Sequence, residues 1–352
     1  MCSLKHEPTP AMIEVLRPIW QRVLERSSIR IEDNFFDLGG DPSSATKLFT
    51  EIARVCHREL PPVVIYHAPT IAAMAALLDE PAMPRFPPLV LMKAGTEKPP
   101  VFITHGVGGS VMELFELVAH IRVRHPILGM QAKGIDGVEE PFDCIEDMAQ
   151  FQLDAIKELQ PHGPYLLIGH SLGGLVTLEM AQRLSQNGEK VALLAMLDAY
   201  PHARYLSLGQ RVRLLTRLVR HHASTAMRLP VRDAFSYIMG PGERRLRLSR
   251  SGSGLDQLSF DASFAPAIER ARARAYLALA RYRPRFYTGK IRFVRAEISS
   301  EFPDDPAAVW ANLADQFEVE TVPGDHQGIL TTHAESLASV VSRYVREACC
   351  EE

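Results

Sequence analysis

The segment Gly169-His-Ser-Leu-Gly-Gly174 constrains the fold of this chain more than any other part of its sequence. It follows the apolar run at 165–168 and precedes residues 175–184, whose apolar side chains recur with helical spacing. A buried strand, a sharp turn and a helix in this order are typical of a parallel sheet with crossover helices. The flanking glycines would allow a strained turn that exposes the serine hydroxyl. We therefore predict Ser171 as a nucleophile at the edge of a sheet.

Further apolar runs have the length and residue types of strands, and the stretches between them are long enough for crossover helices. This alternation predicts an α/β domain with a largely parallel sheet that helices cover on both faces. The runs lie at 89–93, 101–104, 127–130, 165–168, 191–197, 290–297 and 317–322.

The N-terminal residues 1–80 have helical patterns instead, and we expect them to form a small all-α four-helix bundle. Prolines then cluster in residues 81–98, which predicts a linker between two domains. The α/β domain is expected at 86–352, beginning inside the proline-rich segment. The helical stretches of the bundle are 13–24, about 43–57, 63–67 and 70–78.

A serine hydroxyl needs a histidine base, and the histidine needs a carboxylate that fixes its tautomer. Asp198 directly follows the apolar run at 191–197, as expected for an acid at the end of a strand. His326 follows the run at 317–322 in the loop sequence Pro-Gly-Asp-His-Gln-Gly. The order of these residues predicts Ser171, Asp198 and His326 as a catalytic triad.

Two neighbours compete for these roles. Asp325 adjoins His326, but adjacent side chains on an extended loop diverge, which favours a turn or capping role for Asp325. His170 adjoins Ser171 within the turn, where reaching the serine hydroxyl is sterically awkward. We expect His170 to pack against the neighbouring strand.

Acyl transfer also needs backbone N–H groups that stabilise a developing oxyanion. The N–H of Leu172, directly after the nucleophile, is the first candidate. The second is expected in the glycine-rich loop 105–110, which follows an early strand, and Val107 is the preferred residue there. Phosphate binding is the alternative role for such a loop, but the chain lacks both a GxGxxG fingerprint and a P-loop lysine.

The interval between Asp198 and the strand at 290–297 is longer than one crossover requires, which predicts a helical lid at about 202–285. Residues 201–260 contain eleven arginines and three acidic residues. This charge is either a solvated helical face or a docking surface for an acidic carrier protein and its phosphate, in which Arg213, Arg217 and Arg220 would take part.

Composition excludes several classes of partner. A net charge of −3 gives no basic field for nucleic acid, and no apolar run reaches the length of a membrane span. The N-terminus lacks the apolar stretch of a signal peptide, so we expect a cytoplasmic protein. The five cysteines have no metal-ligand or disulfide spacing, and no metal is expected.

The chain resembles the carrier and thioesterase didomain of nonribosomal peptide synthetases and polyketide synthases. The elbow GHSLGG, the sequence Leu-Asp-Ala-Tyr-Pro at 197–201 and Gly-Asp-His at 324–326 have the family's order. The resemblance implies a lidded α/β-hydrolase that acts as a thioesterase and accepts an acyl or peptidyl chain from a carrier thioester on Ser171. Water or an internal nucleophile would then release the chain.

Residues 33–50 resemble the carrier signature, in which a serine directly after Gly-Gly-Asp or Gly-Gly-His carries 4′-phosphopantetheine. Pro42 occupies that position in this chain and has no hydroxyl. Attachment to Ser43, a vestigial carrier kept for docking or folding, and a substitution particular to this sequence are three interpretations. The second is preferred, because a shift of one residue rotates a side chain by about 100° at a helix start.

The expected partners are an acyl or peptidyl carrier domain, or upstream synthetase modules, and a small-molecule acyl-thioester substrate. An editing thioesterase that clears carriers in trans, a general carboxylesterase, and a docking or scaffold module are the alternative functions. Hydrolysis and cyclisation both remain open, since one sequence does not report the packing inside a lid.

Overall fold

A computed structural model of the chain describes residues 8–80, 87–213, 215–216, 219, 265–298, 302–303 and 305–350. Most of the predicted lid, including Arg217, Arg220 and residues 221–264, lies outside these ranges, as does the first part of the predicted linker, 81–86.

The second domain is built on a seven-stranded sheet in the order β1-β3-β2-β4-β5-β6-β7. Every neighbouring pair is parallel except the edge pair of β1 and β3, which is antiparallel. The predicted largely parallel sheet is therefore confirmed. The strands are β1 Leu89–Lys93, β2 Val101–Thr104, β3 Ile127–Met130, β4 Tyr165–His170, β5 Val191–Leu197, β6 Tyr287–Ile298 and β7 Ala314–Asp325.

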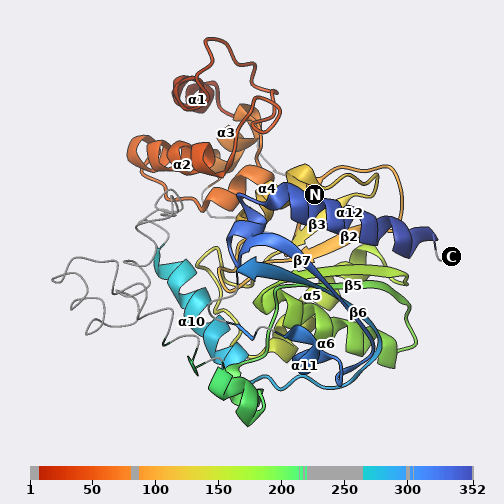
Figure 1. Cartoon of the computed structure of the whole chain (residues 1–352). Coiled ribbons are helices and arrows are strands. Elements are labelled where there is room, and N and C mark those ends of the chain that lie inside the picture. Colours follow the sequence, from red (N-terminus) through yellow and green to blue (C-terminus); the bar gives the residue numbers. More distant parts are fainter. Residues whose placement is uncertain are drawn as a thin grey trace.

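Helices cover both faces of the sheet (Figure 1). Two separate clusters of buried apolar side chains fill the space between sheet and helices, because parallel strands present apolar residues on both faces. One face carries α4 Phe115–His120 and α12 Ala334–Cys350. The other face carries α5 Ile145–Leu159, α6 Leu172–Gln186, α10 Ala265–Arg281 and α11 Pro306–Trp310.

The strand order reverses direction at β2. From β2 the chain first moves to β3 on one side and then returns to β4 on the other side. The loops that leave β2 and β4 therefore diverge at the carboxyl edge of the sheet, where ligands bind in open α/β sheets. Ser171 and the glycine-rich loop 105–110 both lie at this switch point.

A buried carboxylate anchors α10, one of the described helical segments of the predicted lid, to the core. The side chain of Glu179 on α6 is 1% exposed, and its oxygens lie 3.0 Å from Arg285 Nη2. Tyr282, one residue beyond α10, donates its hydroxyl to Glu179 Oε2 at 3.1 Å. A carboxylate is buried in a protein when it is paired with an opposite charge. The pairing of Glu179 with Arg285 therefore fixes the position of α10 over the sheet.

The N-terminal residues form a helical bundle, as predicted. Thr9 caps the first helix by accepting a hydrogen bond from the N–H of Met12, and Asp41 caps the second by accepting from the N–H of Ser44. Trp20 and Phe35 meet edge to face in its core, with ring centroids 5.4 Å apart. The elements are α1 Pro10–Val23, α2 Pro42–Cys56, the short 3₁₀ helix η1 Pro62–Tyr66 and α3 Ile71–Asp79.

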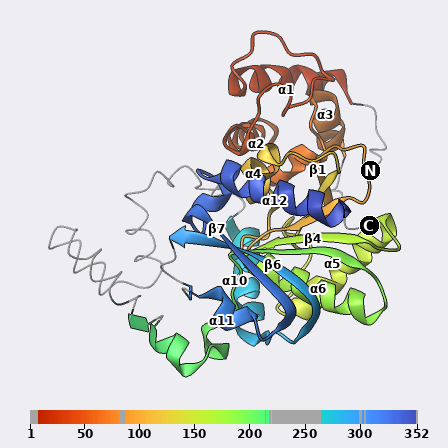
Figure 2. The same cartoon turned by 45° about the vertical axis from the view of Figure 1, so that its right-hand side comes forward.

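The bundle packs directly on the α/β domain (Figures 1 and 2). Val90 on β1, and Val111 and Met112 on the 3₁₀ helix η2 Val111–Leu114, belong to the same buried apolar cluster as the bundle core. The ring of Phe36 from the bundle stacks on that of Phe115, the first residue of α4, with centroids 5.6 Å apart. The two domains thus share a continuous apolar interface.

Candidate active site

Ser171 occupies the turn between β4 and α6 in a strained backbone conformation, with φ 54° and ψ −121°. All six residues of β4 are buried, and so the strand holds the turn rigidly. A Cβ atom on Gly169 would lie 2.2 Å from the carbonyl oxygen of Gly173, so only glycine permits this close approach. The local sequence therefore produces the turn that sequence analysis expected, with its strain at Ser171.

The structure brings Ser171, Asp198 and His326 together from three different strand ends. His326 Nε2 lies 3.0 Å from Ser171 Oγ, and His326 Nδ1 lies 2.8 Å from Asp198 Oδ2. The Asp198 side chain is 1% exposed, and its other oxygen accepts a hydrogen bond from the N–H of Ala296. Since a carboxylate oxygen only accepts, His326 donates its Nδ1 proton to Asp198 and turns the Nε2 lone pair to the serine.

His170 is buried beneath His326 rather than only against a neighbouring strand. The two imidazole rings stack with centroids 4.7 Å apart, and His170 Nε2 lies 3.1 Å from the carbonyl oxygen of His326. The His326 ring also contacts Phe302, with centroids 4.7 Å apart. Asp325 caps its own turn by accepting the N–H of Gly328, and its side chain is not the one that meets His326 Nδ1.

Glu113 is a site residue that sequence analysis did not identify. Its Oε1 accepts the N–H of Gly106 and lies 3.8 Å from His170 Nδ1. Burial acts to raise the pKa of the Glu113 carboxyl, but His170, His105 and the Gly106 N–H outweigh it and hold the pKa below its usual range. No motif marks Glu113, because its proximity to His170 depends on how η2 folds back over the loop.

The two predicted oxyanion donors lie on neighbouring segments of the site. Leu172 is the first residue of α6, and Val107 lies on the loop after β2. Within the described residues, neither N–H has a hydrogen-bond acceptor. Free N–H groups at a helix start and on a glycine-rich loop are the donors that a developing oxyanion requires.

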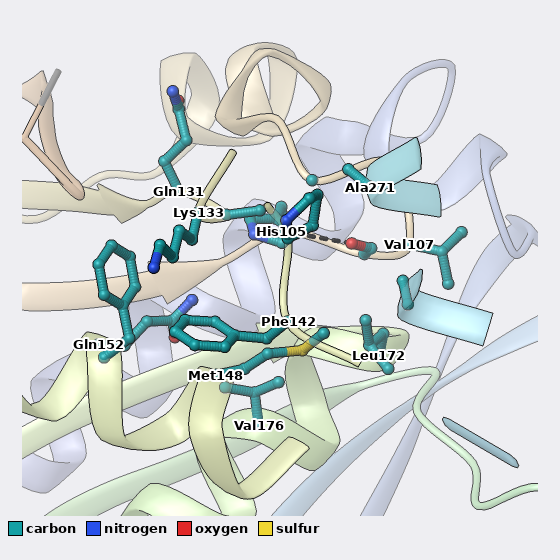
Figure 3. Close-up of a pocket in the computed structure, with 16 residues that line it drawn as sticks. His105, Val107, Gln131, Lys133, Phe142, Met148, Gln152, Leu172, Val176 and Ala271 are labelled. Carbon is teal, nitrogen blue, oxygen red and sulfur yellow. Dashed lines mark hydrogen bonds between the residues drawn. The ribbon is translucent and has the colours of Figure 1, made fainter. Parts of the chain in front are cut away.

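A cavity opens beside these two amides, between the β2 and β3 loops and helices α5, α6 and α10 (Figure 3). Its walls are largely apolar, with Phe142, Met148 and Val176 on one side and Ala271 and Ala275 of α10 on another. Val107 and Leu172 also line the cavity, which places it next to the turn that carries Ser171.

His105 and Gln152 are polar residues that line this cavity. His105 Nδ1 lies 2.6 Å from the carbonyl oxygen of Gly106, so this nitrogen carries the proton. Burial lowers the pKa of His105 and keeps the ring neutral, which leaves Nε2 as a buried acceptor without a partner in the described chain. Gln152 Oε1 accepts from the Thr104 hydroxyl at 3.1 Å.

The start of α2 does not suit attachment of phosphopantetheine at the usual position. Pro42 is the first helical residue and has no hydroxyl. The hydroxyl of Ser44 is engaged with Asp41, which also accepts the N–H of Ser44. Ser43 is exposed, but it lies one residue beyond the family's attachment position.

A parallel sheet with helices on both faces and a Ser, Asp and His arrangement at its carboxyl edge define the α/β-hydrolase class. Within that class the chain belongs to the thioesterase family, because the model described as "Thioesterase domain" matches residues 99–344. The model "Phosphopantetheine attachment site" matches residues 14–78. The chain is thus a carrier and thioesterase didomain of the kind found in nonribosomal peptide synthetases.

Relatives agree with this assignment. The chain is 37% identical over 196 residues to a dimodular nonribosomal peptide synthase of Bacillus subtilis (strain 168), covering 55% of this chain and 8% of that protein. It is 34% identical over 199 residues to an indigoidine synthase of Dickeya dadantii (strain 3937), covering 55% of this chain and 13% of that protein. The chain therefore spans a small part of these curated relatives.

A solved structure shares the fold of both domains. A holo four-domain nonribosomal peptide synthetase bound to AMP and glycine superposes with a TM-score of 0.59 and 23% identity, covering 97% of this chain and 26% of that one. Among the described residues, no cluster of His, Cys, Asp or Glu could hold a metal ion. None of the described helices is long and apolar enough to cross a membrane.

Proposed function

We propose that this chain cleaves acyl or peptidyl thioesters by forming an oxoester on Ser171. The observation that carries the proposal is the hydrogen-bonded series from Asp198 through His326 to Ser171 Oγ, with distances of 2.8 and 3.0 Å. We assign this chemistry to a domain at 86–352 and the carrier-like bundle to 1–80.

In the first step, Ser171 Oγ forms a bond to the thioester carbonyl carbon while its proton passes to His326 Nε2. The N–H groups of Val107 and Leu172 would stabilise the negative oxygen of the tetrahedral intermediate. The bond from carbon to sulfur then breaks, and His326 returns its proton to the leaving sulfur. Asp198 stabilises the charged imidazole between these two transfers and keeps its tautomer fixed.

In the second step, water or a nucleophile within the acyl chain attacks the Ser171 ester. His326 accepts the proton of that nucleophile and gives it to Ser171 Oγ as the ester bond breaks. The apolar walls of the cavity support binding of an apolar acyl portion next to the ester. The amide of Gln152, which also lines the cavity, would offer a hydrogen bond to a polar group on the same chain.

The substrate would come from a carrier other than residues 1–80. Pro42 cannot form the phosphodiester, Ser44 is engaged in the helix cap, and Ser43 lies one residue beyond the family's attachment position. A loaded carrier from an upstream module or a separate synthetase would therefore deliver the thioester. The same observation favours a second candidate function, an editing thioesterase that clears mis-acylated carriers in trans.

Thiol release from matched substrates tests the proposal. Wild type and His326→Ala would be compared on short thioesters, on an acyl-loaded separate carrier, and on oxoesters of the same acyl groups. We expect thioesters to turn over faster than oxoesters and His326→Ala to abolish both activities. Turnover of oxoesters alone would indicate a general carboxylesterase, and no turnover of any substrate by folded protein would favour the scaffold function.

A further inference from the structure

We propose that the carrier-like bundle is a structural clamp on the active site. It would hold η2 in place, so that Glu113 positions both the oxyanion loop and the histidine base. This inference rests on the proposed function for its catalytic readout, but the physical contacts do not depend on that function.

The first step is the contact between the domains. Phe36 lies between two rings, since its centroid is 4.8 Å from that of Tyr66 in the bundle and 5.6 Å from that of Phe115 in the α/β domain. Val111 and Met112 of η2 are at most 2% exposed and pack in the cluster that contains the bundle core. Removing the Phe36 ring would therefore remove a packing partner of Phe115, the first residue of α4, which directly follows η2.

The second step is the placement of Glu113. It lies between Met112, which packs against the bundle, and Leu114, which packs in the core under the sheet. Both neighbours are fully or almost fully buried, and they fix the rotation of the short helix. The Glu113 carboxylate is thereby directed at the loop after β2, where it accepts the N–H of Gly106.

The third step is the tight packing around Gly106. A Cβ atom on this residue would lie 3.1 Å from Glu113 Oε1, 3.2 Å from His170 Nδ1 and 3.3 Å from Ser171 Cβ. The loop that carries the Val107 N–H therefore has no space to shift toward Ser171. A movement of Glu113 would release Gly106 and with it the orientation of the Val107 N–H.

The fourth step leads to the base. His170 lies 3.8 Å from Glu113 and contacts His326 through both ring stacking and the His326 carbonyl oxygen. Glu113 is thus the point from which the bundle could influence both the oxyanion donor and the base. A bundle that cannot be loaded at Pro42 would still contribute to catalysis through this contact.

Single and paired substitutions test the clamp in the full chain. Phe36→Ala should lower kcat on a short thioester by roughly 2- to 30-fold with little change in KM. Phe36→Leu, which keeps an apolar side chain at the interface, should restore most of the rate. Val55→Ala is the matched control, because Val55 lies on an exposed part of the same bundle and should leave kcat unchanged.

A double-mutant cycle then locates the coupling. In a Glu113→Ala background, Phe36→Ala should cause no further loss of kcat, because both act through the same contact. If the losses of kcat from the two single substitutions multiply in the double variant, the clamp is overturned. A Phe36→Ala enzyme with wild-type kcat would also overturn it. Hydrogen exchange at the Gly106 amide gives a readout without substrate: Phe36→Ala should speed it and Val55→Ala should not. Unchanged exchange would contradict the clamp even if the thioesterase function itself failed.

Discussion

The imidazole of His170 stacks on that of His326 at a centroid distance of 4.7 Å and an interplanar angle of 29°. The same side chain also reaches the His326 carbonyl oxygen, at 3.1 Å. His170 therefore restrains the ring and the backbone of the base together. In the proposed mechanism, His170 thus supports the histidine that would activate Ser171.

Substituting His170 should lower turnover without removing the triad. His170→Phe keeps the stacking but loses the hydrogen bond to His326, and we expect its kcat to fall roughly 10-fold. His170→Ala loses both contacts, and its kcat should fall by about 100-fold. Small misplacements of catalytic groups have effects of this size. Steady-state thiol release measures the change. Equal rates for both variants and wild type would refute this supporting role.

Asp198→Asn should lower kcat strongly, although asparagine has nearly the same size and shape as aspartate. The amide can donate to His326 Nδ1, which would turn the wrong tautomer toward Ser171 and lower kcat by about 10⁴-fold. Thermal unfolding serves as the control, because the Ala296 N–H can still bond to the remaining carbonyl oxygen. A loss of only a few fold would mean that another acid orients the base.

Pro42→Ser should restore phosphopantetheine loading to the bundle. The serine would begin α2 directly after the Asp41 cap, at the position where the family attaches the group. After incubation with coenzyme A and a phosphopantetheinyl transferase, intact-mass analysis should find the added mass on Pro42→Ser and not on wild type. A full mass shift on wild type that Ser43→Ala removes would show attachment at Ser43 instead.

The bundle should lose stability in mild acid because of His67. Burial lowers the pKa of His67 to about 4, whereas an unfolded histidine titrates near 6.5. Between these values the unfolded state binds more protons than the folded state, so stability is intact above pH 6.5 and falls as the pH drops toward 4, by about 1.4 kcal/mol per unit.

Unfolding of wild type and His67→Gln at a series of pH values measures this effect. The difference in unfolding free energy between the two proteins should change by roughly 3 kcal/mol from pH 7 to pH 4 and should be flat above pH 7. A difference that does not vary with pH would show that His67 is protonated without cost in the folded bundle.

The elements that sequence analysis predicted best have strong local patterns. The runs at 101–104 and 191–197 became buried strands, and the elbow around Ser171 has the expected order of strand, turn and helix. Local patterns succeed there because strand burial and glycine sterics are local properties. The antiparallel partner of β1 could not be predicted, since pairing depends on residues far apart in sequence.

The supporting residues of the site were missed for the same physical reason. Glu113 and Gln152 carry no motif, and each gains its role from a residue that is distant or on another element, His170 in one case and Thr104 in the other. The sequence predicted that His170 packs against the neighbouring strand, but a sequence does not report that its ring stacks on His326. The interface role of Phe36 was likewise hidden within a carrier signature.

The most direct test of the proposed mechanism is intact-mass analysis of the protein mixed with an acyl thioester and quenched during turnover. We predict a mass increase equal to the acyl group on wild type, mapped to the peptide that contains Ser171, and none on Ser171→Ala, whose thiol release should also vanish. Unchanged thiol release by folded Ser171→Ala, or an acyl group mapped elsewhere in the chain, would contradict the account.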